Sequence, residues 1–168
     1  MATNQQFEIA FDDTQNTMTI RRTFGADRQL VWDCHTQSSL LDQWFAPKPL
    51  TTKTKFMDFR AGGHWHYAMI TPDGQQFWGR MDYQTIDPID GYTLLDGFCD
   101  DTGALNRDMP QARWEVSFQT AAGRTLVQTI VAYNSAEALE KVIAMGMKEG
   151  MTSTLERLDE LLLTLGAT

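Results

Sequence analysis

Features of membrane, secreted and zinc-binding proteins are scarce in this sequence of 168 residues. It has only two cysteines, Cys34 and Cys99, which lie far apart and form no CxxC pair, so we expect neither a disulfide framework nor a zinc site. No apolar run approaches the roughly 18–20 residues that a membrane-spanning helix needs. The N-terminal segment lacks the basic start and apolar middle of a signal peptide. We therefore expect a cytoplasmic protein in which both cysteines are small buried apolar residues.

Positive charge and catalytic motifs are also scarce. The chain has 14 lysines and arginines against 22 aspartates and glutamates, a net charge of −8, and no basic cluster. Because an acidic surface repels phosphate groups, we expect no nucleic-acid partner and no binding to an anionic membrane. The sequence has no GxSxG, no phosphate-binding glycine loop, no HExxH and no dinucleotide fingerprint, so we expect no cofactor. The lack of repeats and linkers predicts one domain over residues 1–168.

The chain does contain a clear succession of helix and strand signals in its N-terminal part. Residues 7–24 indicate two strands broken around residues 12–16, and β-branched residues mark the second strand. A helix is expected to begin at Asp27, and a second, short helix is expected over Ser38–Trp44.

The middle of the chain, from Leu50 to Tyr133, predicts a series of strands. Alternating segments are separated by turn sequences such as residues 71–74, a Thr-Pro-Asp-Gly tetrapeptide. Strands joined by such short links pair mostly antiparallel. The polar segment at residues 100–110 is expected to be a surface loop, a lid or a contact site.

The C-terminal segment predicts one long helix that begins at an N-cap, Ser135. About 30 residues would make a helix about 45 Å long, enough to lie across a whole sheet. The expected core stripe steps by three or four residues and consists of Leu139, Ile143, Met147, Gly150, Thr154, Leu158, Leu161 and Leu165. These elements together predict an α+β fold, with an antiparallel sheet wrapped around the long C-terminal helix.

The side chains of this stripe are large at both ends and small at Gly150 and Thr154, so the surface of the helix has a dent at its middle. One interpretation is that Gly150 lets the helix approach the sheet closely, with aromatic side chains filling the space. The other is that the dent forms one wall of a cavity for a flat apolar ligand, and the sequence leaves both open. The residues expected to line such a ligand site are Trp44, Phe45, Trp65, Tyr67, Met69, Phe77, Met81, Tyr83, Trp114, Met147, Gly150, Met151 and Thr154.

Few polar residues are candidates for chemistry. His64 and His66 share a strand face and could bind a metal with Asp82, but that face is opposite the aromatic one, so we expect both histidines in solvent and no metal site. Asp96 and Glu149 could approach the cavity and act as a general acid or base. Exposed carboxylates are the expected state of both.

The order of several short motifs carries a resemblance to a known family. These motifs are Arg22-Thr23-Phe24, Val31-Trp32, Trp44-Phe45-Ala46-Pro47, Asp58-Phe59-Arg60-Ala61-Gly62-Gly63, Pro72-Asp73-Gly74, Ile86-Asp87-Pro88, and Gly146 through Met151 to Leu155 and Leu158. They resemble homologues of the activator of the Hsp-90 ATPase, in the START-like (SRPBCC) helix-grip superfamily. Met151 departs from the tryptophan common in that family, which should alter local packing more than fold. The resemblance implies a helix-grip domain with two short helices after the N-terminal strands and a cavity between sheet and C-terminal helix.

Three functions compete at this point. The first is binding of a small apolar molecule in the cavity, without catalysis. The second is a cyclase- or hydrolase-like enzyme that uses polar groups in the same cavity. The third is a protein-interaction domain, with a chaperone as a less favoured partner and a homodimer as a further expectation. Polar groups facing the cavity would separate the first two.

Overall fold

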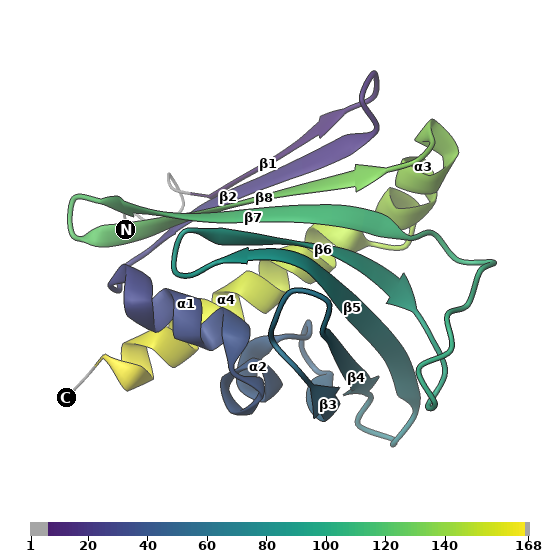
Figure 1. Cartoon of the computed structure of the whole chain (residues 1–168), viewed down its shortest axis with the longest axis horizontal. Helices are drawn as coiled ribbons and strands as arrows, with labels where there is room; N and C mark the ends of the chain where they lie inside the picture. Colours follow the sequence, from purple (N-terminus) through teal and green to yellow (C-terminus); the bar gives the residue numbers. More distant parts are fainter. Residues whose placement is uncertain (1–6, 167–168) are drawn as a thin grey trace.

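The computed structural model describes residues 7–166, and one curved antiparallel sheet dominates it (Figure 1). The strands are β1 (Phe7–Asp12), β2 (Thr17–Phe24), β3 (Thr51–Met57), β4 (His64–Ile70), β5 (Gln76–Asp87), β6 (Gly91–Phe98), β7 (Ala112–Ala121) and β8 (Arg124–Tyr133). Their order in the sheet is β1-β2-β8-β7-β6-β5-β4-β3. The pairing of β2 with β8 joins the two ends of the strand region and leaves β1 and β3 as the edges.

Four helices lie on the concave side and around the ends of the sheet. They are α1 (Arg28–Thr36), α2 (Ser38–Trp44), α3 (Ala136–Ala144) and α4 (Met147–Leu165). In Figure 1 α4, drawn in yellow, crosses the sheet, with α1 and α2 beside its C-terminal half and α3 at its other end. This confirms the predicted α+β helix-grip fold. In the described part of the chain, no helix combines the length and the apolar character needed to span a membrane.

The N-terminal elements follow the sequence signals closely. The first two strands are separated by a turn at residues 13–16, and α2 has the predicted bounds. Helix α1 begins where expected because the carboxylate of Asp27 accepts a hydrogen bond of 2.8 Å from the backbone N–H of Leu30. That bond satisfies one of the free N–H groups of the first turn.

The prediction of a single C-terminal helix is wrong, because the helix breaks between α3 and α4. Gly146 has φ +89°, in the left-handed region that favours glycine, and its N–H bonds the carbonyl of Ile143 at 3.0 Å. The hydrophobic stripe continues in the same spacing across the break, so periodicity alone could not reveal it. Ile143, which lies just before the break and was expected in the core, is 36% exposed.

The hydrophobic core lies between the concave face of the sheet and the helices. Alternate residues of each strand point inward, such as Trp65 and Tyr67 of β4 and Trp114 and Phe118 of β7. Cys34 is fully buried there, as predicted for a small apolar residue, whereas the same prediction is wrong for Cys99, which is only half-buried.

The outer face of the sheet corrects one prediction about the histidines. His64 is half-buried, but His66 is only 5% exposed, so the expectation that both lie in solvent is wrong for His66. Its Nε2 lies 3.0 Å from the carbonyl oxygen of Asp100, and its ring contacts Trp78. The beginning of the loop at residues 100–110 therefore covers the outer face rather than the concave side. Across residues 7–166 no group of three His, Cys, Asp or Glu side chains is arranged to hold a metal ion.

Candidate functional site

Two hollows lie between the concave face of the sheet and α4, and a third, of about 170 Å³, lies where α3 meets α4 and shares Asp96, Phe98 and Met147 with the larger of the two. The deeper one has a volume of about 40 Å³. The larger one, called the main pocket below, has a volume of about 250 Å³ and lies between β4, β5 and β6 on one side and the first half of α4 on the other. Phe77 and Phe98 lie at its margin and are 49% and 37% exposed. The concave side is therefore filled at its deep end and hollow near its margin.

Most of the predicted ligand-site residues come together around the main pocket. The ten that line it are Phe45, Tyr67, Met69, Phe77, Met81, Trp114, Met147, Gly150, Met151 and Thr154. They come from β4, β5, β7, α4 and the end of α2. Strand alternation places the β residues on one face, and a step of three or four places those of α4 opposite them.

The other three predicted residues, Trp44, Trp65 and Tyr83, line the deep hollow instead. All three are almost fully buried. A hollow of 40 Å³ holds little more than water, because one water needs roughly 10–15 Å³ of such volume. For these side chains the interpretation as core packing fits better than contact with a ligand.

Six further residues line the main pocket, and of these the sequence had put forward only Asp96, as a possible general acid or base that approaches the cavity. They are Pro47, Trp78, Gly79, Asp96, Gly97 and Phe98. Phe98 was also detectable in principle, because Asp96 and Phe98 continue the inward alternation of Tyr92 and Leu94 along β6. Pro47 was not detectable, because no pattern in the sequence places the segment after α2 next to α4.

Gly150 faces Pro47 across the pocket rim rather than a strand of the sheet. A Cβ atom built on Gly150 would meet only Cγ and Cβ of Pro47, at 3.9 and 4.0 Å. These are ordinary van der Waals distances, so no close contact requires a glycine here. The interpretation that Gly150 allows close approach to the sheet is therefore wrong, and its missing side chain leaves open space.

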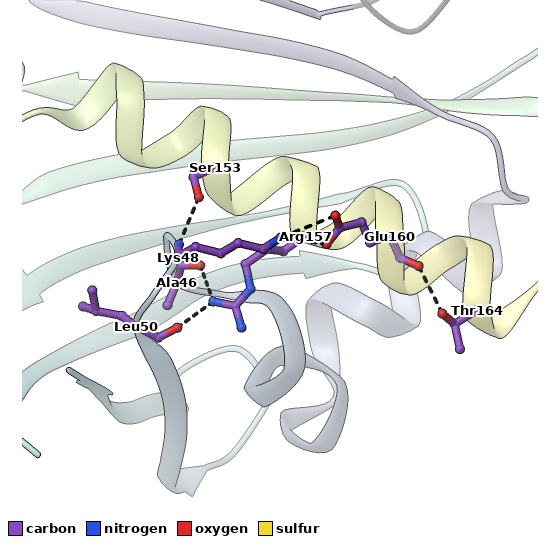
Figure 2. A network of polar contacts seen from close by, with 7 residues as sticks. All are labelled: Ala46, Lys48, Leu50, Ser153, Arg157, Glu160 and Thr164. Carbon is purple, nitrogen blue, oxygen red and sulfur yellow. Dashed lines mark hydrogen bonds and ion pairs between the residues drawn. The ribbon is translucent and has the colours of Figure 1, made fainter. Parts of the chain in front are cut away.

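A polar network fixes the segment that carries Pro47 against α4 (Figure 2). Nη1 of Arg157 donates hydrogen bonds of 2.7 Å to the carbonyl oxygens of both Ala46 and Leu50. The backbone N–H of Lys48 donates to the hydroxyl of Ser153 at 2.9 Å. Because two carbonyls share one half-buried guanidinium, the position of this rim depends on Arg157.

Asp96 is the single charged side chain among the residues that line the main pocket. Its Oδ1 accepts a hydrogen bond of 2.9 Å from the backbone N–H of Ala112, and its Oδ2 accepts one of 2.7 Å from the indole N–H of Trp114. Burial raises the pKa of Asp96 to about 6, although both hydrogen bonds favour the charged form. The expectation of an exposed carboxylate is wrong for Asp96, whereas Glu149 is exposed as predicted.

Tyr67 brings a second polar group to the pocket. Its ring packs flat over Gly79, where a Cβ would lie 2.7 Å from the hydroxyl oxygen, so this position needs a glycine. Burial, with a smaller contribution from the charge of Asp96, raises the pKa of Tyr67, which keeps the phenol neutral. No buried side-chain polar atom among residues 7–166 lacks a partner, so the Tyr67 hydroxyl, which bonds to none of these residues, faces open space.

The remaining titratable groups near the concave side are poorly suited to catalysis. Burial raises the pKa values of the Cys34 and Cys99 thiols to about 11, so neither forms a nucleophilic thiolate at neutral pH. Burial lowers the pKa of His35 to about 4, and its Nδ1 lies 2.8 Å from the carbonyl oxygen of Val31. His35 lines the deep hollow and not the main pocket. The titratable groups that line the main pocket are thus one carboxyl group and one phenol.

Comparisons with known proteins agree with this architecture. The family model described as activator of Hsp90 ATPase homolog 1-like protein matches residues 25–163. A solved structure from Mycobacterium smegmatis is 30% identical with a TM-score of 0.85, covering 92% of this chain and 95% of that one. One from Arthrobacter aurescens is 28% identical with a TM-score of 0.87, covering 92% and 90%. One from Staphylococcus epidermidis is 29% identical with a TM-score of 0.79, covering 92% and 94%. No curated protein matches the chain.

Proposed function

The chain belongs to the family of activator of Hsp90 ATPase homolog 1-like proteins, and on that premise we propose that its main pocket binds one small hydrophobic molecule. The observation that carries the proposal is a hollow of about 250 Å³ with a lining of aromatic, methionine and glycine residues. Such linings are typical of sites for flat apolar ligands.

The volume of the pocket indicates the size of the ligand. An apolar cavity of about 150 Å³ in an engineered protein binds benzene. The main pocket is larger, and a molecule of about two fused aromatic rings is the size that its 250 Å³ supports. The flexible side chains of Met81, Met147 and Met151 can adjust to its outline.

A test is to fill the pocket from Gly150 and measure binding of a neutral probe, naphthylmethanol. In Gly150→Leu the new side chain extends into the pocket, whereas Gly150→Ala adds only a methyl group with room to spare. The probe should stabilise the wild type and Gly150→Ala by about 2.7 kcal/mol at a hundredfold excess over Kd, and Gly150→Leu hardly at all. Thermal unfolding and isothermal titration calorimetry both report this difference, and circular dichroism checks that each variant is folded.

Two outcomes would contradict the proposal. Equal binding by the folded Gly150→Leu and Gly150→Ala variants would place the site elsewhere. The absence of any shift in Tm with apolar probes and with cell lipid extracts would remove the basis for a ligand. Native mass spectrometry of freshly purified protein complements the test, since a ligand that copurifies would appear as a mass difference.

A further inference from the structure

The carboxylate of Asp96 adds a chemical requirement to the apolar pocket. We infer that the main pocket selects hydrophobic molecules that carry a protonated amine, and that Asp96 binds the ammonium group. This inference rests on the proposed ligand-binding function and names the class of ligand.

The first argument is that Asp96 has no cationic partner among the residues that the structure describes. No ion pair among residues 7–166 includes Asp96, and no lysine, arginine or histidine lines the main pocket. Asp96 is half-buried, and a carboxylate that loses part of its hydration without a counter-charge is unfavourable, because apolar groups replace the lost water. A cationic ligand would supply the missing charge.

The second argument is the hydrogen-bonding capacity that remains. An ionised carboxylate has about four acceptor positions and no donor. The N–H groups of Ala112 and Trp114 use one position on each oxygen. The ligand group that complements the rest must therefore donate hydrogen bonds, and an ammonium group has up to three donors and the opposite charge. Anionic ligands are disfavoured by repulsion.

The third argument is that two aromatic residues with polar groups, Trp114 and Tyr67, line the pocket together with Asp96. The indole N–H of Trp114 binds Oδ2 of Asp96 directly, so the ring of Trp114 is held beside the carboxylate. Tyr67 lines the same pocket, and its hydroxyl, without a partner among the described residues, can accept a hydrogen bond from the ligand. Trp114 thus orients the carboxylate, and Tyr67 offers the ammonium group a second acceptor.

The titration of Asp96 gives this site a testable pH dependence. Burial raises its pKa to about 6, so the carboxyl is mostly ionised at pH 7.5 and mostly protonated at pH 5. The other titratable groups that face it are Tyr67 of β4 and Tyr133 of β8, whose pKa values burial raises, so both stay neutral in this range. The pocket-lining residues of β5, β7 and α4 carry no charge.

The experiment compares three probes of the same ring size by calorimetry at pH 7.5: naphthylmethylamine, naphthylmethanol and naphthoate. The wild type should bind the amine about tenfold or more tightly than the alcohol, as expected for a hydrogen bond to a charged group, and the naphthoate most weakly. In Asp96→Asn the Kd values for the amine and the alcohol should agree within about twofold, because the amide keeps the size of the side chain but not its charge.

A second measurement needs no variant and so remains decisive if Asp96→Asn does not fold. Between pH 7.5 and pH 5 the affinity of the wild type for the amine should fall about tenfold, although the amine itself stays protonated. The affinity for the alcohol should hardly change. The loss follows from protonation of Asp96.

The outcomes separate this inference from the proposed function. If the alcohol binds the wild type and Gly150→Leu abolishes that binding, but the amine has no advantage, the ligand class is wrong and the pocket function stands. The same conclusion follows if the preference for the amine persists at pH 5 or in Asp96→Asn. If none of the three probes binds, both proposals are overturned.

Discussion

Asp96 and His35 should give the folding stability opposite pH dependences that nearly cancel. Burial raises the pKa of Asp96 to about 6, so the folded state holds this proton more tightly than the unfolded state. Acidification from pH 7.5 to 5 therefore stabilises the fold through Asp96. Burial lowers the pKa of His35 to about 4, so the unfolded state takes up the proton first. The same acidification therefore destabilises the fold through His35.

The magnitudes follow from the two pKa values and those of the unfolded chain. With an unfolded pKa of about 3.9 for Asp and a folded one of about 6, Asp96 adds about 1.4 kcal/mol between pH 7.5 and pH 5. With an unfolded pKa of about 6.5 for His and a folded one of about 4, His35 removes about 2 kcal/mol over the same range. Together they change the free energy of unfolding by only about 0.6 kcal/mol.

Removing either group should reveal the other. Asp96→Asn should lose about 1.4 kcal/mol more on acidification than the wild type, whereas His35→Asn should lose about 2 kcal/mol less. The comparison uses urea unfolding at pH 7.5 and 5.0 at constant ionic strength, followed by fluorescence of the five tryptophans and by circular dichroism. Differences between variant and wild type remove the contributions of all other titratable groups.

One result would refute this reasoning for each residue. If the free energy of unfolding of Asp96→Asn changed with pH as that of the wild type does, within about 0.5 kcal/mol, then Asp96 would not be a buried carboxylate that is charged at neutral pH. The same result for His35→Asn would mean that the imidazole is accessible to protons in the folded state. The urea m-values of all proteins must agree for the comparison to hold.

Two further predictions concern the elements that shape the pocket. Arg157→Met should lower the free energy of unfolding by about 2 kcal/mol, because two carbonyl oxygens lose a charged donor. The control is Lys48→Met, which removes an exposed ion pair of 3.3 Å and should cost less than about 1 kcal/mol. Urea unfolding measures both. Gly146→Ala should destabilise the protein by about 1–2 kcal/mol, because the backbone of Gly146 is left-handed. Gly150→Ala should stabilise it by about 0.5–1 kcal/mol, because Gly150 is helical and has room for a methyl group. Opposite shifts in Tm would confirm both backbone assignments.

The fold was predictable from the sequence because its signals are local. The N-cap of α1 at Asp27, the bounds of α2 and the alternation along β4 to β8 each depend on a few neighbouring residues. The break at Gly146 was missed because the spacing of apolar residues is the same on both sides of it. A glycine followed by a continuing pattern does not show whether its backbone is left-handed or helical.

The candidate site was predictable only in part, because its geometry depends on contacts between distant segments. The inward faces of the strands and of α4 follow from periodicity, and they account for ten of the pocket residues. The division into a filled deep end and an open margin depends on how Trp44, Trp65 and Tyr83 pack together. The position of Pro47 depends on hydrogen bonds between Arg157 and a segment more than 100 residues earlier. No local pattern encodes either feature.

The charge of Asp96 is the feature of the pocket that folding alone explains least. At this inward position of β6, the neighbouring residues along the same face are Leu94 and Phe98, and an acidic side chain breaks the apolar pattern. The fold uses Asp96 as an acceptor for the N–H groups of Ala112 and Trp114. Because neither donor is charged, neither needs a charged acceptor, and burial makes the ionised form unfavourable. A negative charge kept at an inward position, with no cation beside it among residues 7–166, is understandable if a cation arrives with the ligand.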